Sequence, residues 1–317
     1  MSTPIAPWLP PEAATTGVVK GPDSAPKRDR QHPRFEIRQA MNQNILYGIV
    51  LLSAVGHAVW NALLKNATDR LIMMVAIRIV GLLYGLVVLS VVQWPAAASL
   101  PWVLAATLAM WIYQGLLIQG YQVGDLSFVY PLARGVAPVL LTGLAFLSIG
   151  ETIALYQFLG VISISVGIAT LAFLGQGGWP SLVYAVLIGA SIATYSLLSG
   201  VGVRYSGNLL GFSAALEVAT GLGMLTYATS TRGGSIVPSL LTIWPTGLGA
   251  GAISVGGYLS FLVAVSYLPI GPVSAIRECS ALFGVLIGVF VMNERFGVVR
   301  AIGAFLMTGG IVLLSLF

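Results

Sequence analysis

Polar side chains recur every four residues in the apolar stretch SAVGHAVWNALLK. On an α-helix they would form one polar line down a single face: Ser53, His57, Asn61 and Lys65. Imidazole and amide groups can bind a small polar solute, and His57 can titrate near neutral pH. We expect Ser53, His57 and Asn61 to face the interior of a helical bundle, with Trp60 beside them. A packing role for His57 and a lipid-facing Trp60 are the alternatives.

Ionisable residues lie deep in several other apolar segments. Together with His57 they are Arg78, Arg134, Glu217, Arg277 and Glu278. An ionisable side chain at the centre of a bilayer costs about 2.5 to 3.5 kcal/mol on insertion scales, so each is a candidate for function. Three arginines face two carboxylates. The excess of positive charge favours an anionic or zwitterionic solute.

The segment YPLARGVAP places Tyr130, Arg134 and Pro138 at four-residue intervals on one helix face. Pro138 has no N–H and crowds the carbonyl group of Arg134, so the helix should kink or loosen there. Freed carbonyl groups are tolerated at membrane depth only against protein or a watery cavity. We expect Arg134 and Tyr130 to line that cavity. The alternative is an internally paired Arg134 that locks two helices.

Arg277 and Glu278 are adjacent, and adjacent residues point about 100° apart on a helix. Each is therefore expected to need its own partner, and Glu217 is the natural partner of Arg277. A structural ion pair and a proton-coupling or gating role are both open for Glu217 and Glu278.

Amides occur in the segment WIYQGLLIQGY. Gln114, with Tyr113 beside it, is the better candidate for binding a solute, because an amide offers two donors and an acceptor. Gln119 lies near the helix end, where an interhelical hydrogen bond is the preferred interpretation, and this alternative stays open for Gln114. Tyr258, at the end of the segment GLGAGAISVGGY, is a further cavity candidate.

The composition indicates an integral membrane protein. Of the 317 residues, 57% are hydrophobic and 8% are charged, whereas a soluble domain has about 25% charged residues. Windows of about 20 apolar residues predict ten spanning helices, at residues 45–64, 72–92, 101–121, 127–148, 153–173, 181–201, 209–229, 244–266, 272–292 and 297–316. The basic, proline-rich segment 1–42 is expected to be a disordered tail that stays in the cytoplasm.

An internal repeat relates the two parts of the chain. Residues 133–171 align without a gap with residues 276–314. Four identities support this register: Arg134 with Arg277, Glu151 with Glu294, Gly160 with Gly303, and Gly167 with Gly310. We expect two five-helix halves, 43–174 and 175–317. Because five is odd, the second half would be inverted in the membrane, with a substrate site near the midplane.

These features resemble the drug/metabolite transporter superfamily, and within it the EamA family of ten-helix carriers. The resemblance rests on the helix through Pro138 that ends in LSIGE at Glu151, on VFVMNE at Glu294, and on Arg78. Ala281 departs from it, because it stands where the first copy has Pro138. The segment GHAVWNALLK resembles a subset of carriers, some linked to phosphonate use. The resemblance implies a carrier of the bacterial-type inner membrane, often an exporter, with both termini cytoplasmic.

Glu151 and Glu294 each precede a new helix, where a carboxylate is favoured by the helix dipole and can cap free N–H groups. We expect both to be structural, together with Pro138, Gly160 and Gly303.

The sequence therefore predicts a secondary transporter that works by alternating access, an exporter by its resemblance, for a small zwitterionic or anionic metabolite such as an amino acid or amino-phosphonate. A carrier of drug cations or lipid-linked phosphate and a non-transporting partner subunit are the alternatives. An enzyme is not expected, because HExxH, GxSxG and P-loop motifs are absent from the sequence. The expected partners are the solute and the lipid bilayer, without cofactor, metal or nucleic acid. Proton coupling and a homodimer remain open.

Overall fold

The computed structural model describes residues 43–65, 67–123, 126–174, 177–233, 236–283, 286 and 297–315. The tail 1–42, Glu294 and the side chain of Lys65 lie outside the described part, so the expectations for them stay predictions. Every regular element in the described ranges is a helix.

Within the described residues, eight helices are long and apolar enough to cross a membrane, so the structure is that of an all-α, multi-pass membrane protein. They are α2 (Gln43–Lys65), α3 (Arg70–Val91), α4 (Leu100–Val123), α5 (Leu126–Ile149), α6 (Leu155–Thr170), α7 (Trp179–Tyr205), α8 (Leu209–Arg232) and α9 (Ile236–Val265). Two shorter helices follow, α10 (Ile270–Glu278) and α12 (Val298–Ser315). Short 3-10 helices precede α4 and follow α6, at Ala97–Ser99 and Leu171–Leu174.

Two helices differ from the predicted spans. The helix α9 begins at Ile236 rather than near residue 244, because Pro238 lies in its first turn, where a missing N–H leaves no helical bond unmade. The helix α10 ends at Glu278, and Cys279 forms a turn before helical geometry resumes at residues 280–283.

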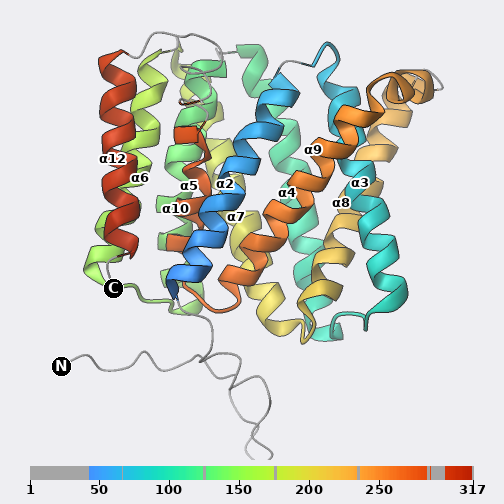
Figure 1. Cartoon of the computed structure of the whole chain (residues 1–317), viewed down its shortest axis with the longest axis horizontal. Helices are drawn as coiled ribbons and strands as arrows, with labels where there is room; N and C mark the ends of the chain where they lie inside the picture. The colour runs from blue at the N-terminus through green and yellow to red at the C-terminus, as the bar shows by residue number, and fades with distance from the viewer. Residues whose placement is uncertain are drawn as a thin grey trace, which may run out of the picture. The chain divides into compact units, whose positions relative to one another are not determined.

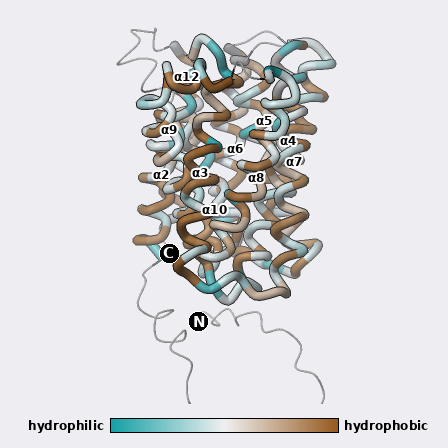
Figure 2. Tube along the Cα trace, turned by 90° about the vertical axis from the view of Figure 1, so that its right-hand side faces the viewer, coloured by the Kyte–Doolittle hydropathy of each residue, from teal (hydrophilic) through white to brown (hydrophobic). Residues whose placement is uncertain are grey.

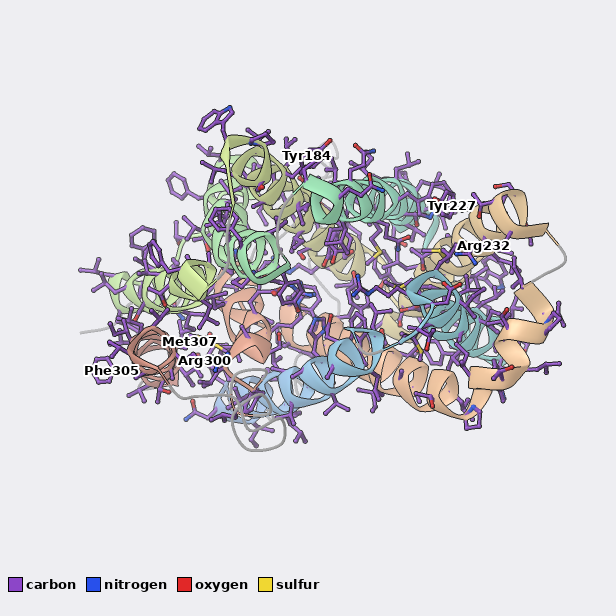
Figure 3. The ribbon with its side chains drawn as sticks, turned by 90° about the horizontal axis from the view of Figure 1, so that it is seen from above. Tyr184, Tyr227, Arg232, Arg300, Phe305 and Met307 are labelled. Atoms are coloured by element: carbon purple, nitrogen blue, oxygen red, sulfur yellow. The ribbon has the colours of Figure 1, made fainter. Side chains whose placement is uncertain are left out.

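The outer surface suits a lipid environment. Leu147, Phe173 and Phe305 are each more than three-quarters exposed (80%, 81% and 77%), which an aqueous solvent would penalise. Figure 2 shows apolar residues along most of the helix length and hydrophilic ones mainly near the helix ends. In the view of Figure 3, Phe305 lies on the outside of α12 while Met307 lies on the side toward the other helices.

The helices α6 and α12 pack side by side and run in opposite directions (Figure 1). Gly160 lies against Gly310, and Gly167 lies against Gly303, so closely that a Cβ on Gly167 would come within 2.8 Å of the Gly303 carbonyl oxygen. Larger residues at these positions would push the two backbones apart.

Helices from the two predicted halves are interleaved. The helix α3 packs against α8 and α9, α2 packs against α9, and α7 packs against both α4 and α5. The start of α2 and the end of α12 lie at one end of the bundle, the lower one in Figure 1. We call this end face A; it also carries Glu151, Arg204 and Leu268. The opposite end, with Asp69 and Arg232, is face B.

Candidate functional site

Three charged side chains meet between α5 and α10. Arg134 of α5 is 4% exposed, Arg277 of α10 is 5% exposed, and Glu278 is fully buried. Arg134 Nη1 donates to Glu278 Oε2, while Arg277 Nη2 donates to Glu278 Oε1 at 3.2 Å. We call these three residues the charged cluster. Both carboxylate oxygens of Glu278 are already engaged by guanidinium groups.

The observed partner of Arg277 corrects the sequence prediction. Arg277 was expected to pair with Glu217, and its neighbour Glu278 was expected to need a separate partner. Instead Arg277 turns back onto Glu278, with Nε at 3.4 Å and Nη2 at 3.2 Å from Oε1. This contact forms where α10 gives way to the turn at Cys279, and the long arginine side chain spans the angle between neighbours. Arg277 Nη2 also donates to Ser196 Oγ of α7 at 3.2 Å.

The charged cluster lies near the middle of the bundle. Arg134 is eight residues from Leu126, where α5 starts at face B, and Glu278 is eight residues from Ile270, where α10 starts at face A. At 1.5 Å per residue, each side chain is about 12 Å from its own face. In a hydrocarbon core of about 30 Å, this places the cluster close to the midplane.

His57 of α2 reaches the same cluster. Arg134 Nη2 lies 2.7 Å from His57 Nε2, and Trp60 Nε1 lies 3.3 Å from His57 Nδ1. Guanidinium and indole groups only donate hydrogen bonds, and a neutral imidazole can accept at one nitrogen. The shorter contact assigns that acceptor to Nε2. His57 is therefore neutral in this arrangement, since a doubly protonated ring has no lone pair to accept from Arg134.

The rest of the predicted polar line on α2 does not reach across the bundle. Asn61 Nδ2 donates to the carbonyl oxygen of His57 at 2.7 Å, and Ser53 Oγ donates to that of Val50 at 2.7 Å. Small polar side chains in a helix satisfy themselves on the preceding turn in this way. These bonds engage the Ser53 hydroxyl group and one donor of the Asn61 amide, and the expectation that both residues face a cavity stays a prediction. Trp60 is half-buried beside His57, with ring centroids 4.9 Å apart in an edge-on arrangement.

Aromatic rings cover the arginines of the cluster. The guanidinium carbon of Arg134 lies 5.0 Å from the ring centroid of Tyr130, and that of Arg277 lies 4.2 Å from the ring of Phe261. Such cation–π contacts stabilise a desolvated cation. Tyr130 was predicted at this site, whereas Phe261 was missed, because a phenylalanine in an apolar helix carries no sequence signal for an arginine neighbour.

Further tyrosines lie around the cluster. Tyr113 of α4 packs against Tyr195 of α7 with centroids 5.7 Å apart, and Tyr258 of α9 donates to Ser199 at 2.7 Å. Tyr195 and Ser199, like Ser196, were not predicted. They lie on α7, whose mixture of small, polar and apolar residues has no clear periodicity in the sequence.

The two glutamines of α4 have different surroundings. Gln119 is exposed and accepts a hydrogen bond from Tyr184 of α7 at 3.0 Å, at the periphery of the bundle where Figure 3 labels Tyr184. This is the interhelical bond that the sequence favoured for Gln119. Gln114 is half-buried and has no hydrogen bond within the described residues.

A second buried ion pair joins α3 and α8. Arg78 Nη1 lies 3.6 Å from Glu217 Oε2, and the two side chains are 16% and 7% exposed. Both residues are eight positions from the start of their helices, so this pair also lies near the midplane. Arg78 and Glu217 therefore neutralise each other, and neither belongs to the charged cluster.

Glu151 caps a different helix from the one expected. The helix α6 begins four residues after Glu151, with no side-chain cap of its own from that carboxylate. Instead Glu151 Oε2 accepts from the backbone N–H of Ile270, the first residue of α10, at 2.8 Å. Its Oε1 accepts from Arg204 Nη2 at 2.9 Å, and Arg204 also donates to the Leu268 carbonyl group. Glu151 thus fixes the start of the helix that carries Arg277 and Glu278.

Pro138 is buried within α5, which continues through it and through Pro131. Thr142 Oγ1 donates to the Pro138 carbonyl oxygen at 2.8 Å, which satisfies one carbonyl group of this part of the helix.

Comparison with known proteins identifies the fold alone. No protein-family model matches the sequence, and no curated protein matches it. Twenty-eight chains of solved structures are similar. One of them, described only as "Crystal structure of protein", aligns with a TM-score of 0.66 and 15% identity, over 86% of this chain and 96% of its own. The arrangement of helices therefore occurs in another protein.

Proposed function

We propose that the protein is a secondary transporter for a small anionic or zwitterionic metabolite, of the amino acid or amino-phosphonate class. The observation that carries this proposal is the charge of the cluster at mid-bundle. Two arginines face one carboxylate, and the neighbouring His57 is neutral, so one positive charge is left over among groups in contact. An uncompensated buried charge is costly. A bound anion would supply the missing counter-charge.

The donors of the cluster suit a carboxylate or phosphonate. Arginine presents several N–H groups in a planar fork that matches two oxygens of such an anion. Arg134 Nε is buried and has no hydrogen-bond partner among the described residues. The aromatic rings of Tyr130 and Phe261 would keep the guanidinium groups oriented while the solute replaces one of their contacts with Glu278.

Helix contacts support the two inverted halves that alternating access requires. The repeat pairs Gly160 with Gly303 and Gly167 with Gly310. Exchanging the halves then converts the contact between Gly160 and Gly310 into the contact between Gly303 and Gly167, and both occur. The packing of α2 on α9 corresponds in the same way to that of α4 on α7. We infer that rocking of the halves exposes a central site to each face in turn.

The same arguments support membership of the EamA family and a position in a bacterial-type inner membrane. Residues 1–42 contain six of the basic residues of the chain, which favours a cytoplasmic N-terminus by the positive-inside rule. Because the start of α2 and the end of α12 share face A, both ends of the chain would then be cytoplasmic. Export is the direction that the family resemblance favours.

A carrier of drug cations is less well supported. Both oxygens of Glu278 are occupied by arginines, and Glu217 is next to Arg78, so neither carboxylate is free to bind an organic cation.

Ligand-dependent thermal stabilisation of the purified protein tests the proposal. The panel contains glutamate, 2-aminoethylphosphonate, succinate and tetraethylammonium. A ligand at 100 times its dissociation constant stabilises the folded state by about 2.7 kcal/mol. We expect stabilisation by an anion or zwitterion, its loss in Arg134→Gln, and its retention in the matched variant Arg232→Gln, whose arginine is exposed at face B. Stabilisation by tetraethylammonium alone would reject the proposal.

A further inference from the structure

The two buried carboxylates among the described spans differ in how firmly their charge is held. Glu278 is fully buried, and both of its oxygens receive guanidinium groups. A proton on Glu278 would leave Arg134 and Arg277 side by side without a counter-charge in a medium of low dielectric constant. The loss of the negative charge at Glu278 is therefore electrostatically costly.

Glu217 is held by one looser contact. Its Oε2 lies 3.6 Å from Arg78 Nη1, and no other cation of the described chain lies within 4.0 Å. Arg78 Nε is buried and has no hydrogen-bond partner among the described residues. This pair is neutral, and a proton on Glu217 would leave one cation, Arg78, whose side chain is 16% exposed. Proton binding here therefore costs less electrostatically than at Glu278.

Few other ionisable groups face Glu217. The helix α3 contributes Arg78 and, one to two turns away, Tyr84, while α9 contributes Tyr258, whose hydroxyl group donates to Ser199. The helices α4 and α7 also pack against α8, but they bring no cation within 4.0 Å among the described residues. His57 is a poorer proton acceptor, because a second proton on its ring would replace the Arg134 hydrogen bond by a contact between two cations.

The space around Glu217 excludes larger ligands. A Cβ atom on Gly81 of α3 would overlap the Glu217 carboxylate, and one on Gly85 would come within 2.6 Å of the Ala214 carbonyl oxygen. The two helices approach this closely only because both positions are glycine. A proton needs no added volume, whereas an organic solute would force α3 and α8 apart.

Polar groups continue from Glu217 toward face A along the same interface. Ser213 lies one turn before Glu217, about 6 Å along the helix axis, and its hydroxyl group is 3.3 Å from that of Tyr84. At face A, Asn208 Nδ2 donates to the Gln93 carbonyl oxygen. Hydroxyl groups both donate and accept, so Ser213 and Tyr84 continue the polar groups of this interface from Glu217 toward face A.

We propose that Glu217 is the proton-binding group that couples solute movement to a proton gradient, with Arg78 as its counter-charge. The step is the conversion of one carboxylate and one proton into a carboxylic acid, with no other bond changed. Arg78 then loses its partner, and the contact between α3 and α8 weakens. This inference rests on the proposed transport function for its role, but the protonation itself can be measured without any solute.

The first measurement is infrared difference spectroscopy of the full-length protein in lipid, recorded on stepwise acidification. We expect a band of a protonated, buried carboxyl group that shifts in heavy water and is lost in Glu217→Gln. It should persist in the matched variant Glu151→Gln, whose carboxylate lies at face A. Glu217→Asp should restore the band with a shifted midpoint, which separates loss of the acid from misfolding. Absence of the band from the wild type, or its persistence in Glu217→Gln, would overturn the inference.

The second measurement uses proteoliposomes and radiolabelled glutamate or 2-aminoethylphosphonate, whichever stabilises the wild type more. In Glu217→Gln we expect exchange of solute across the membrane to continue, while accumulation driven by a pH gradient falls to the level reached without a gradient. Gradient-driven accumulation in this variant would refute the coupling role. If neither compound binds the wild type, the proposed substrate class fails, and the infrared result still decides whether Glu217 binds the proton.

Discussion

Arg134 contacts three different neighbours with a single guanidinium group. It pairs with Glu278, donates to His57, and covers the ring of Tyr130. Each contact comes from a different element or turn, so the side chain joins α2, α5 and α10 near the midplane. Arg277 adds Ser196 of α7 and Phe261 of α9 to the same centre. Neutralising one member of such a network affects all of its neighbours, because the remaining charges stay buried.

This network predicts that a single substitution lowers the stability of the folded protein more than a double substitution that removes one charge of each sign. Glu278→Gln leaves two arginines without a counter-charge, and breaking a buried pair in this way costs about 3 to 5 kcal/mol. Arg134→Gln combined with Glu278→Gln removes one charge of each sign. We expect the double variant to be more stable than Glu278→Gln alone, as measured by thermal unfolding in detergent. Additive losses would show that Arg134 and Glu278 do not stabilise each other.

At the scale of the elements, apolar windows predicted the bounds of most helices well. They carry no information on which helices pack together. The helices α2 to α8 begin and end within four residues of the predicted spans. Hydrophobic length determines these bounds, and it can be read locally. The early start of α9 was missed by the apolar windows, and the segment before residue 244 carries Pro238 in its first turn and is followed by Pro245 inside the helix.

The sequence predicted the ion-pair partners of the buried charges least well, because these partners depend on contacts between helices that are distant in the chain. Arg277 and Glu217 were paired by charge alone, whereas the fold brings Arg78 next to Glu217 and leaves Arg277 with its neighbour Glu278. Which charges meet depends on how α3, α8 and α10 pack, and on the reach of a long side chain. Neither quantity has a signature in the spacing of residues along one helix. His57 and Arg134 were recognised because each interrupts an apolar helix.

The cap on α10 gives a prediction at the scale of the element. The Glu151 carboxylate accepts from the Ile270 N–H and pairs with Arg204, and Glu151→Gln removes its negative charge. We expect the free energy of unfolding to fall by about 0.5 to 2 kcal/mol. Asp69→Asn is the matched control. Asp69 caps α3 through the N–H groups of Leu71 and Ile72, and asparagine caps a helix equally well. Thermal unfolding of the two variants measures the difference. Equal, small losses would show that Glu151 does not hold α10.

At the scale of the whole molecule, the buried charged groups lie at a common depth. Arg134, Glu278, Arg78 and Glu217 are each eight residues from the start of their helix, yet their helices start at opposite faces. The side chains therefore converge at the midplane from both sides. A positively charged cluster and a separate neutral pair at one depth would allow a solute and a proton to bind at different places while sharing one conformational change.

Orientation in the membrane can be measured with single cysteines. Cys279 is the chain's sole cysteine and is buried, so Cys279→Ala supplies a background for labelling. Thr68 at face B and Thr152 at face A are both exposed. The six basic residues of segment 1–42 favour a cytoplasmic face A. We therefore expect an impermeant maleimide to label Thr68→Cys in intact cells, and Thr152→Cys only after permeabilisation. The reverse pattern would place face A outside, and the polar groups between Glu217 and face A would then lead toward the external solution.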